Sequence, residues 1–212
     1  MIGGIITLIV VVVGLGMPKV LESTKKGARS QAINNAKEIG ILLYGFDQDY
    51  GSFPCADTIP KVQSNNPDSN IPLGKSSSND FFRQLIVSGN LNRENPFYAK
   101  CWDNPKPDNV MTGAKALGKG ETPFSYIAGL SSSKYPPETP IVVFPLVAGK
   151  YLFDYKLCKK EYGGTAIVLS LDNTVSFYPV DQSGRVFING KDIFDPSQPF
   201  WQGKAPDVKW PE

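Results

Sequence analysis

Chemistry in this sequence would have to come from aspartates, glutamates and cysteines, because the chain contains no histidine. Histidine is the commonest general base near neutral pH and a common zinc ligand, so its absence removes Ser-His and Cys-His nucleophile systems and the usual zinc sites. No motif places a pair of carboxylates together, and residues 117–122 (LGKGET) lack the GxxxxGK[ST] pattern of a phosphate loop. We therefore expect no enzyme, no catalytic residue and no organic cofactor.

Carboxylates of the kind that bind calcium occur in two groups of aspartates. The first group does not meet the spacing of an EF-hand loop, and solvation of a helix end explains it. The second group lies among turn-forming residues, which explain it equally well. We assign no metal ligand, with calcium kept as an alternative. The two groups are Asp47, Asp49 and Asp57, and Asp181, Asp192 and Asp195.

Three cysteines lie about fifty residues apart, and none belongs to a CxxC pair. One disulfide with a spare thiol is expected if the protein lies outside the cytoplasm. The alternative is three separate thiols in a reducing compartment. The sequence does not decide which two cysteines would pair; Cys55 and Cys101 are the candidate pair that we name, with Cys158 as the third thiol.

The length and charge of the chain restrict its class. A chain of 212 residues can form one globular head with an appendage, and its formal net charge of +2 comes from interspersed acids and bases. No basic face with interleaved aromatics marks a nucleic-acid surface. We therefore expect no nucleic acid among its partners.

The N-terminal segment, residues 1–17 (MIGGIITLIVVVVGLGM), carries no charge and one hydroxyl, at Thr7. As a helix it would cover about 25 Å, slightly less than the ~30 Å hydrocarbon core of a bilayer. A basic n-region and an A-x-A-like cleavage site are both missing, which favours an uncleaved anchor over a removed signal peptide.

Two signals conflict on the orientation of this anchor. Lys19, Lys25, Lys26 and Arg29 follow the apolar segment, and the positive-inside rule would then leave the head in the cytoplasm. The cysteines argue for a head outside it. A start codon placed too far downstream, which would omit a basic leader, would remove the conflict.

Residues 19–50 have the apolar spacing of one amphipathic α-helix. The apolar positions advance in steps of three and four residues. The opposite face carries Lys25, Arg29, Lys37 and Asp47. Gly51 and Pro54 then stop the helix. The apolar positions are Ala28, Ala32, Ala36, Ile39, Leu43, Phe46 and Tyr50.

This arrangement is similar to the N-terminal helix of a known family. The apolar segment, the proline at its end and the run ARSQAINNAKEIGILLYGFDQDYGSFP (residues 28–54) together resemble type IV pilins and type II secretion pseudopilins. Residues 39–54 resemble the family pattern small-x-x-x-x-L/I-x-x-Y-x-x-D-x-G-x-x-P, which closes the helix and leads into the head. The resemblance covers about the first 54 residues.

The resemblance implies an α+β, pilin-like fold in which a long N-terminal membrane-spanning helix packs on a small antiparallel β-sheet with extended loops. Residues 1–18 would be the transmembrane half of the helix, residues 19–50 its amphipathic half, and residues 51–212 a globular α+β head with an extended C-terminal tail. Identical helices would pack together through the assembly residues, which are Leu8, Val12, Pro18, Ala28, Ala32 and Ala36.

The chain departs from the family pattern at its start. Members begin with a basic leader, a peptidase site ending in glycine and the run F-T-L-I-E, whose glutamate lies seventeen residues before the helix-kinking proline. Counting back by seventeen from Pro18 reaches Met1, so the peptidase site and the glutamate are both missing. We expect the true start to lie upstream; the alternative is a relative that is not processed.

The first part of the head is predicted to contain a loop and a short helix. We expect a surface loop over residues 55–78 and a short helix over residues 78–89. A wrapping segment over residues 90–122 should follow, with a short strand near residues 96–102.

Four or so antiparallel strands should make up most of the remainder. Two of them are predicted to form a hairpin that turns at Asp172 and Asn173. Laid over the long helix, these strands would bury its Ile39, Leu43 and Phe46 side chains and give one core.

The tail has no periodicity but carries large aromatics. They would either pin a C-terminal extension across the head, which we favour because a long loop needs anchors, or bind sugars or a partner. The tail anchors that we name are Phe200, Trp201 and Trp210.

The sequence thus predicts a structural subunit, which the resemblance places in a type II secretion or type IV pilus system. It would be a single-pass inner-membrane protein with its head in the periplasm or on the cell surface, and would polymerise through its N-terminal helix. Its partners would be identical or related pilin-like subunits, the inner membrane and the secretion or pilus machinery. The alternative is a single-pass envelope-anchored binding protein whose head recognises a polysaccharide or an exported protein.

Overall fold

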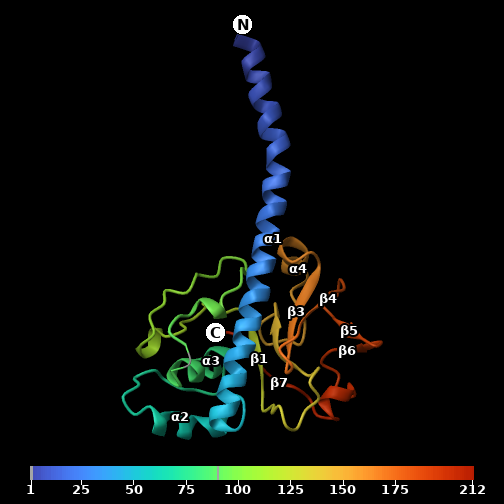
Figure 1. Ribbon diagram of the computed structural model, residues 1–212. Coiled ribbons are helices and arrows are strands. Elements are labelled where there is room, and N and C mark those ends of the chain that lie inside the picture. The colour runs from blue at the N-terminus through green and yellow to red at the C-terminus, as the bar shows by residue number, and fades with distance from the viewer. Residues whose placement is uncertain (1, 90) are drawn as a thin grey trace.

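A computed structural model describes the backbone of residues 2–89 and 91–212, and the side chains of residues 26–89 and 91–212. The fold is α+β, with one long helix, several short helices and a small antiparallel sheet. Figure 1 shows the long helix α1 (Ile2–Tyr50) running down the middle of the head. The sheet lies on one side of it, and α2 (Ile59–Asn65), α3 (Ser78–Val87) and long loops lie on the other. The predicted α+β class is confirmed.

Helix α1 covers Ile2–Tyr50 without interruption. It ends where the sequence predicts, because Gly51 adopts a left-handed conformation with φ of 81° that the helix cannot continue. In Figure 1 the first half of α1 extends beyond the head, whereas its second half is enclosed by the other elements. The helix therefore joins an isolated segment to the core of the head.

The second half of α1 buries the face that the apolar spacing defines. Ile39 and Phe46 are completely buried, and Tyr50, the last position of that face, is half-buried and stacks on Phe46 with ring centroids 4.3 Å apart. Helix α1 packs most closely against η2 (Asn95–Phe97), and also against β3 (Thr165–Ser170), β4 (Val175–Pro179), α3 (Ser78–Val87) and α4 (Tyr155–Glu161). The buried residues of the predicted stripe are Ala28, Ala32, Ala36, Ile39, Leu43 and Phe46.

Within the part of the chain that the structure describes, none of the helices combines the length and the apolar character needed to cross a membrane. The predicted transmembrane half, residues 1–18, lies outside the residues whose side chains are described. Three of the predicted assembly residues, Leu8, Val12 and Pro18, belong to it.

The sheet has five antiparallel strands in the order β4-β3-β2-β1-β7. Strands β1 to β4 correspond to the predicted strands, and β3 and β4 form the predicted hairpin, with Asn173 in its turn at a φ of 63°. Ile127 pairs with Val208, so the C-terminal tail adds an edge strand that the sequence analysis did not foresee. The strands are Ser125–Ala128 (β1), Pro140–Phe144 (β2), Thr165–Ser170 (β3), Val175–Pro179 (β4) and Asp207–Lys209 (β7).

The short helix α3 (Ser78–Val87) lies where the sequence predicts one. Its cap is Ser77, whose Oγ accepts a hydrogen bond from Asp80 N at 3.2 Å while the Asp80 carboxylate accepts from Ser77 N at 3.3 Å. This reciprocal cap fixes the start of the helix at Ser78.

Two expectations about the loops were wrong. Residues 55–78 contain two short helices, η1 (Ala56–Thr58) and α2 (Ile59–Asn65), with Pro60 at a position that favours a helix start. The expected strand near residues 96–102 is absent from the described residues; η2 (Asn95–Phe97) lies there instead, and the chain beyond it contacts α4 (Tyr155–Glu161) through side chains. The remaining elements are η3 (Gly113–Lys115), β5 (Phe187–Ile188), β6 (Lys191–Asp192) and η4 (Pro199–Trp201).

Candidate functional site

The outward face of α1 carries two large apolar side chains that the head does not cover. Ile41 is 63% exposed and Tyr44 is 58% exposed. They border a groove of about 310 Å³ whose lining includes Leu43, Phe53 and Ile141. Two exposed side chains beside a groove do not by themselves mark a contact site, since single exposed apolar residues are common on protein surfaces.

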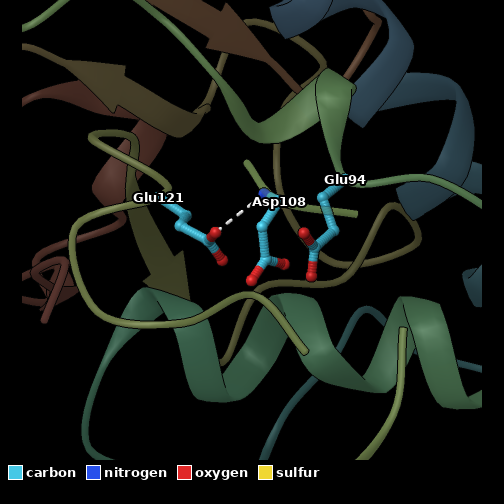
Figure 2. A group of neighbouring side chains, drawn as sticks. All are labelled: Glu94, Asp108 and Glu121. Carbon is cyan, nitrogen blue, oxygen red and sulfur yellow. Dashed lines mark hydrogen bonds between the residues drawn. The ribbon is translucent and has the colours of Figure 1, made fainter. Parts of the chain in front are cut away.

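Three carboxylates from separate parts of the long loop between α3 and β1 converge. Figure 2 shows Glu94, Asp108 and Glu121 pointing toward one another, and one oxygen from each lies within 4.8 Å of the others. Glu94 is fully buried, Glu121 is nearly so and Asp108 is exposed. Carboxylates arranged in this way are the ligand type of hard cations such as calcium.

The oxygens of this carboxylate cluster already accept hydrogen bonds from the loop backbone. Glu94 accepts from the N–H groups of Leu117 at 2.5 Å and Asn109 at 2.8 Å. Glu121 accepts from Gly118 N at 2.5 Å and, as Figure 2 shows, from Asp108 N at 2.9 Å. Since a buried N–H without a partner is costly, the two buried glutamates stabilise a loop of little regular structure.

The electrostatics of the cluster follow from its burial. Burial raises the pKa of Glu94 above its usual value; the hydrogen bond from Leu117 N opposes this rise, and the negative charges of Glu121 and Asp108 add to it. The sequence analysis missed these residues, because they lie in a loop without periodicity and no motif links them.

Among the described residues, the aspartates considered for calcium do not form a group of three that could hold an ion. Asp181 accepts from the N–H groups of Ser183 and Arg185, both at 2.9 Å, and the Arg185 N–H is the main reason that the pKa of its carboxyl is lowered. Asp195 accepts from Ser197 N at 2.8 Å. Both are turn-forming residues. Asp47, of the other group, is buried and accepts from Ser132 Oγ at 2.5 Å.

All three cysteines have free thiols in this structure. Tyr98 O accepts from Asn35 in α1 at 2.7 Å, which places the nearby Cys101 beside the middle of the helix. Cys55 instead follows the end of α1 at Tyr50, about 22 Å further along at 1.5 Å per residue. The candidate pair Cys55 and Cys101 is not joined in this structure.

The tail aromatics lie against the head. Phe200 and Trp201 are buried in the core, and Trp201 Nε1 donates to Ile193 O at 2.7 Å. Trp210 is half-buried and donates from Nε1 to Lys150 O at 3.1 Å. Their rings and donors are thus occupied by the protein itself, which leaves little aromatic surface for a sugar.

No protein-family model matches the chain, and comparisons with curated proteins and with solved structures also give no match. The function is therefore inferred from the sequence and structure of the chain itself.

Proposed function

We propose that this protein is a pilin-like structural subunit that is anchored in the inner membrane and polymerises through its N-terminal helix. The observation that carries the proposal is the continuity of α1, which runs from Ile2 to Tyr50 as one helix. Its second half is part of the core of the head, and its first half extends beyond it (Figure 1). A rigid connection of this kind transmits the position of the apolar segment directly to the head.

The sequence of the first half of α1 supports a role as a membrane anchor. Residues 1–17 contain no charged side chain, and a helix of such residues is stable in a bilayer or against other apolar helices. In a helical assembly of identical subunits, the apolar segments can pack on one another without exposure to water. The small residues Ala28, Ala32 and Ala36 do not take part in this step, since the head buries them.

The proposed machine is a type II secretion or type IV pilus system, with the head in the periplasm or on the cell surface. Partners are other pilin-like subunits, the membrane and the assembly machinery. The proposal includes no catalytic step, cofactor or nucleic acid. The alternative function, binding of a polysaccharide through the tail aromatics, receives less support because Phe200 and Trp201 are buried.

The test is whether the chain enters filaments. The full chain is expressed in cells that carry such a system, surface filaments are sheared off, and the head is detected on them by immunogold labelling. A matched variant, Val12→Lys, places a charge in the apolar segment at a cost of about 2.5–3.5 kcal/mol for insertion, and should remove the label. Unlabelled filaments with wild-type protein in the membrane fraction would contradict the proposal and favour the anchored binding protein.

A further inference from the structure

The segment that carries Cys101 lies against α4, held by three polar contacts. Lys100 Nζ lies 2.9 Å from Glu161 Oε2, and Tyr162 OH donates to Lys100 O at 2.5 Å. On the other side of Cys101, Trp102 Nε1 donates to Asp154 Oδ2 at 2.8 Å. The two neighbours of Cys101 in the chain are thus fixed to the two ends of the same short helix.

These contacts place Cys101 at the level of Cys158. Cys158 lies in α4 between the two attachment points, one turn after Asp154 and one turn before Tyr162. Residues at this spacing lie on the same side of a helix, which is the side that contacts the segment. Cys158 is completely buried, and Cys101 is half-buried.

A tight turn holds the backbone of Cys101 in place. Cys101 N donates to Asn104 Oδ1 and Asn104 N donates to Cys101 O, both at 2.8 Å. The Lys160 ammonium group lies 5.1 Å from the centre of the Trp102 ring and adds a further contact between segment and helix.

The surroundings of the two thiols overlap. Burial raises the pKa of Cys101 to about 11 and that of Cys158 to about 12, and the carboxylate of Asp154 contributes to both. Burial likewise raises the pKa of Tyr162, with Cys101 and Cys158 both contributing. One carboxylate and one phenol are therefore near both cysteines.

We propose that Cys101 and Cys158 form an intrachain disulfide that fastens the loop segment to α4, with Cys55 as the unpaired thiol. The pairing itself rests on these contacts, whereas its formation in the cell rests on the proposed placement of the head outside the cytoplasm. The bond would close a loop that runs from residue 101 to residue 158 and includes the first two strands of the sheet.

The chemistry needs an external disulfide as oxidant, such as a protein disulfide donor or glutathione disulfide. The thiolate of the more accessible Cys101 attacks the oxidant, forms a mixed disulfide and releases one thiol. Cys158, as the thiolate, then attacks the sulfur of Cys101 and releases the second thiol. The two cysteines lose two protons and two electrons, and the oxidant is reduced to two thiols. Because both pKa values are high, we expect slow oxidation at neutral pH.

The test is disulfide mapping of the purified full chain in detergent, equilibrated in a glutathione redox buffer. Free thiols are alkylated, and the protein is digested and analysed without reduction. We expect one linked peptide pair that contains Cys101 and Cys158, with Cys55 alkylated. Reduction should lower the Tm by about 5–15 °C. A linked peptide that contains Cys55, or alkylation of all three thiols under denaturing conditions at every oxidant concentration, would overturn the pairing.

Two variants sharpen this test. Cys55→Ser should retain the linked peptide and the shift in Tm on reduction, whereas Cys101→Ser, at a half-buried site, should lose both. Disulfide mapping of protein that is alkylated in intact cells tests the proposed pairing separately from the proposed function. Reduced cysteines in cells, with the pair formed in vitro, would overturn the outward placement of the head and leave the pairing intact.

Discussion

Asn173, in the turn between β3 and β4, lies directly against Gly40 of α1, so that a Cβ atom at position 40 would be only 2.0 Å from Asn173 Oδ1. The same Cβ would be 3.2 Å from Leu169 Cδ1. A glycine at this point allows the hairpin to approach the helix closely. The contact fixes the position of the sheet along α1.

Gly40→Ala should therefore destabilise the head, by about 1–3 kcal/mol, because the added methyl group forces the turn away from the helix. Gly45→Ala is the matched control, since a Cβ there meets nothing within 4 Å; it should stabilise the helix by about 0.5–1 kcal/mol. Urea unfolding measures both. Asn173→Gly should restore the stability that Gly40→Ala loses. Equal effects of Gly40→Ala and Gly45→Ala would show that the close approach is not required.

The buried face of α1 gives a second prediction. Ile39→Ala should lower the free energy of unfolding by about 2–5 kcal/mol, because the completely buried side chain leaves a cavity between helix and sheet. Ile41→Ala, two residues further on and 63% exposed, should change it by less than about 0.5 kcal/mol. Similar losses for both would mean that the head does not pack on α1 as described.

The carboxylate cluster gives a third prediction, on loop stability. Glu94→Gln should cost about 1–3 kcal/mol at pH 7, because the amide can accept from only one of the two N–H groups that the carboxylate satisfies. Asp108→Asn, at an exposed position, should cost less. Hydrogen exchange of the amides of Leu117 and Asn109 should increase in the Glu94 variant; unchanged exchange would show that the glutamate does not hold the loop.

The raised pKa of Glu94 also fixes the sign of a pH effect. At pH values between the ordinary pKa of a glutamate, 4.5, and the higher pKa of Glu94 in the folded protein, the folded state binds more protons than the unfolded state. Stability from this group therefore increases as the pH falls from 7 through the folded pKa, and levels off below 4.5. The difference in unfolding free energy between wild type and Glu94→Gln should grow on acidification to pH 5. A difference that shrinks would mean that the pKa is lowered.

The sequence predicted best where a physical pattern repeats. The apolar residues of α1 recur at helical spacing from Ala28 to Phe46, and glycine at position 51 ends the helix, so its buried face and its end could both be located. The hairpin turn at Asn173 followed from turn chemistry in the same way.

Other features depend on contacts between distant residues and leave no local pattern. Strand β7 has only three residues, and its pairing with β1 is set by where the tail returns to the sheet. Glu94 and Glu121 come together only when the loop is folded. The sequence could not decide which of the three cysteines pair for the same reason, because spacing in the sequence carries no information about which thiols face each other.

The most direct measurement of the central claim is crosslinking between apolar segments in cells. A single cysteine is placed at Val12 in a chain whose native cysteines are replaced by serine, with a cysteine at the exposed Gln182 as the control for random collision. If subunits assemble through the N-terminal half of α1, oxidation should give a ladder of crosslinked species for Val12→Cys and monomers for Gln182→Cys. Monomers alone for Val12→Cys, in cells that assemble filaments, would contradict the account.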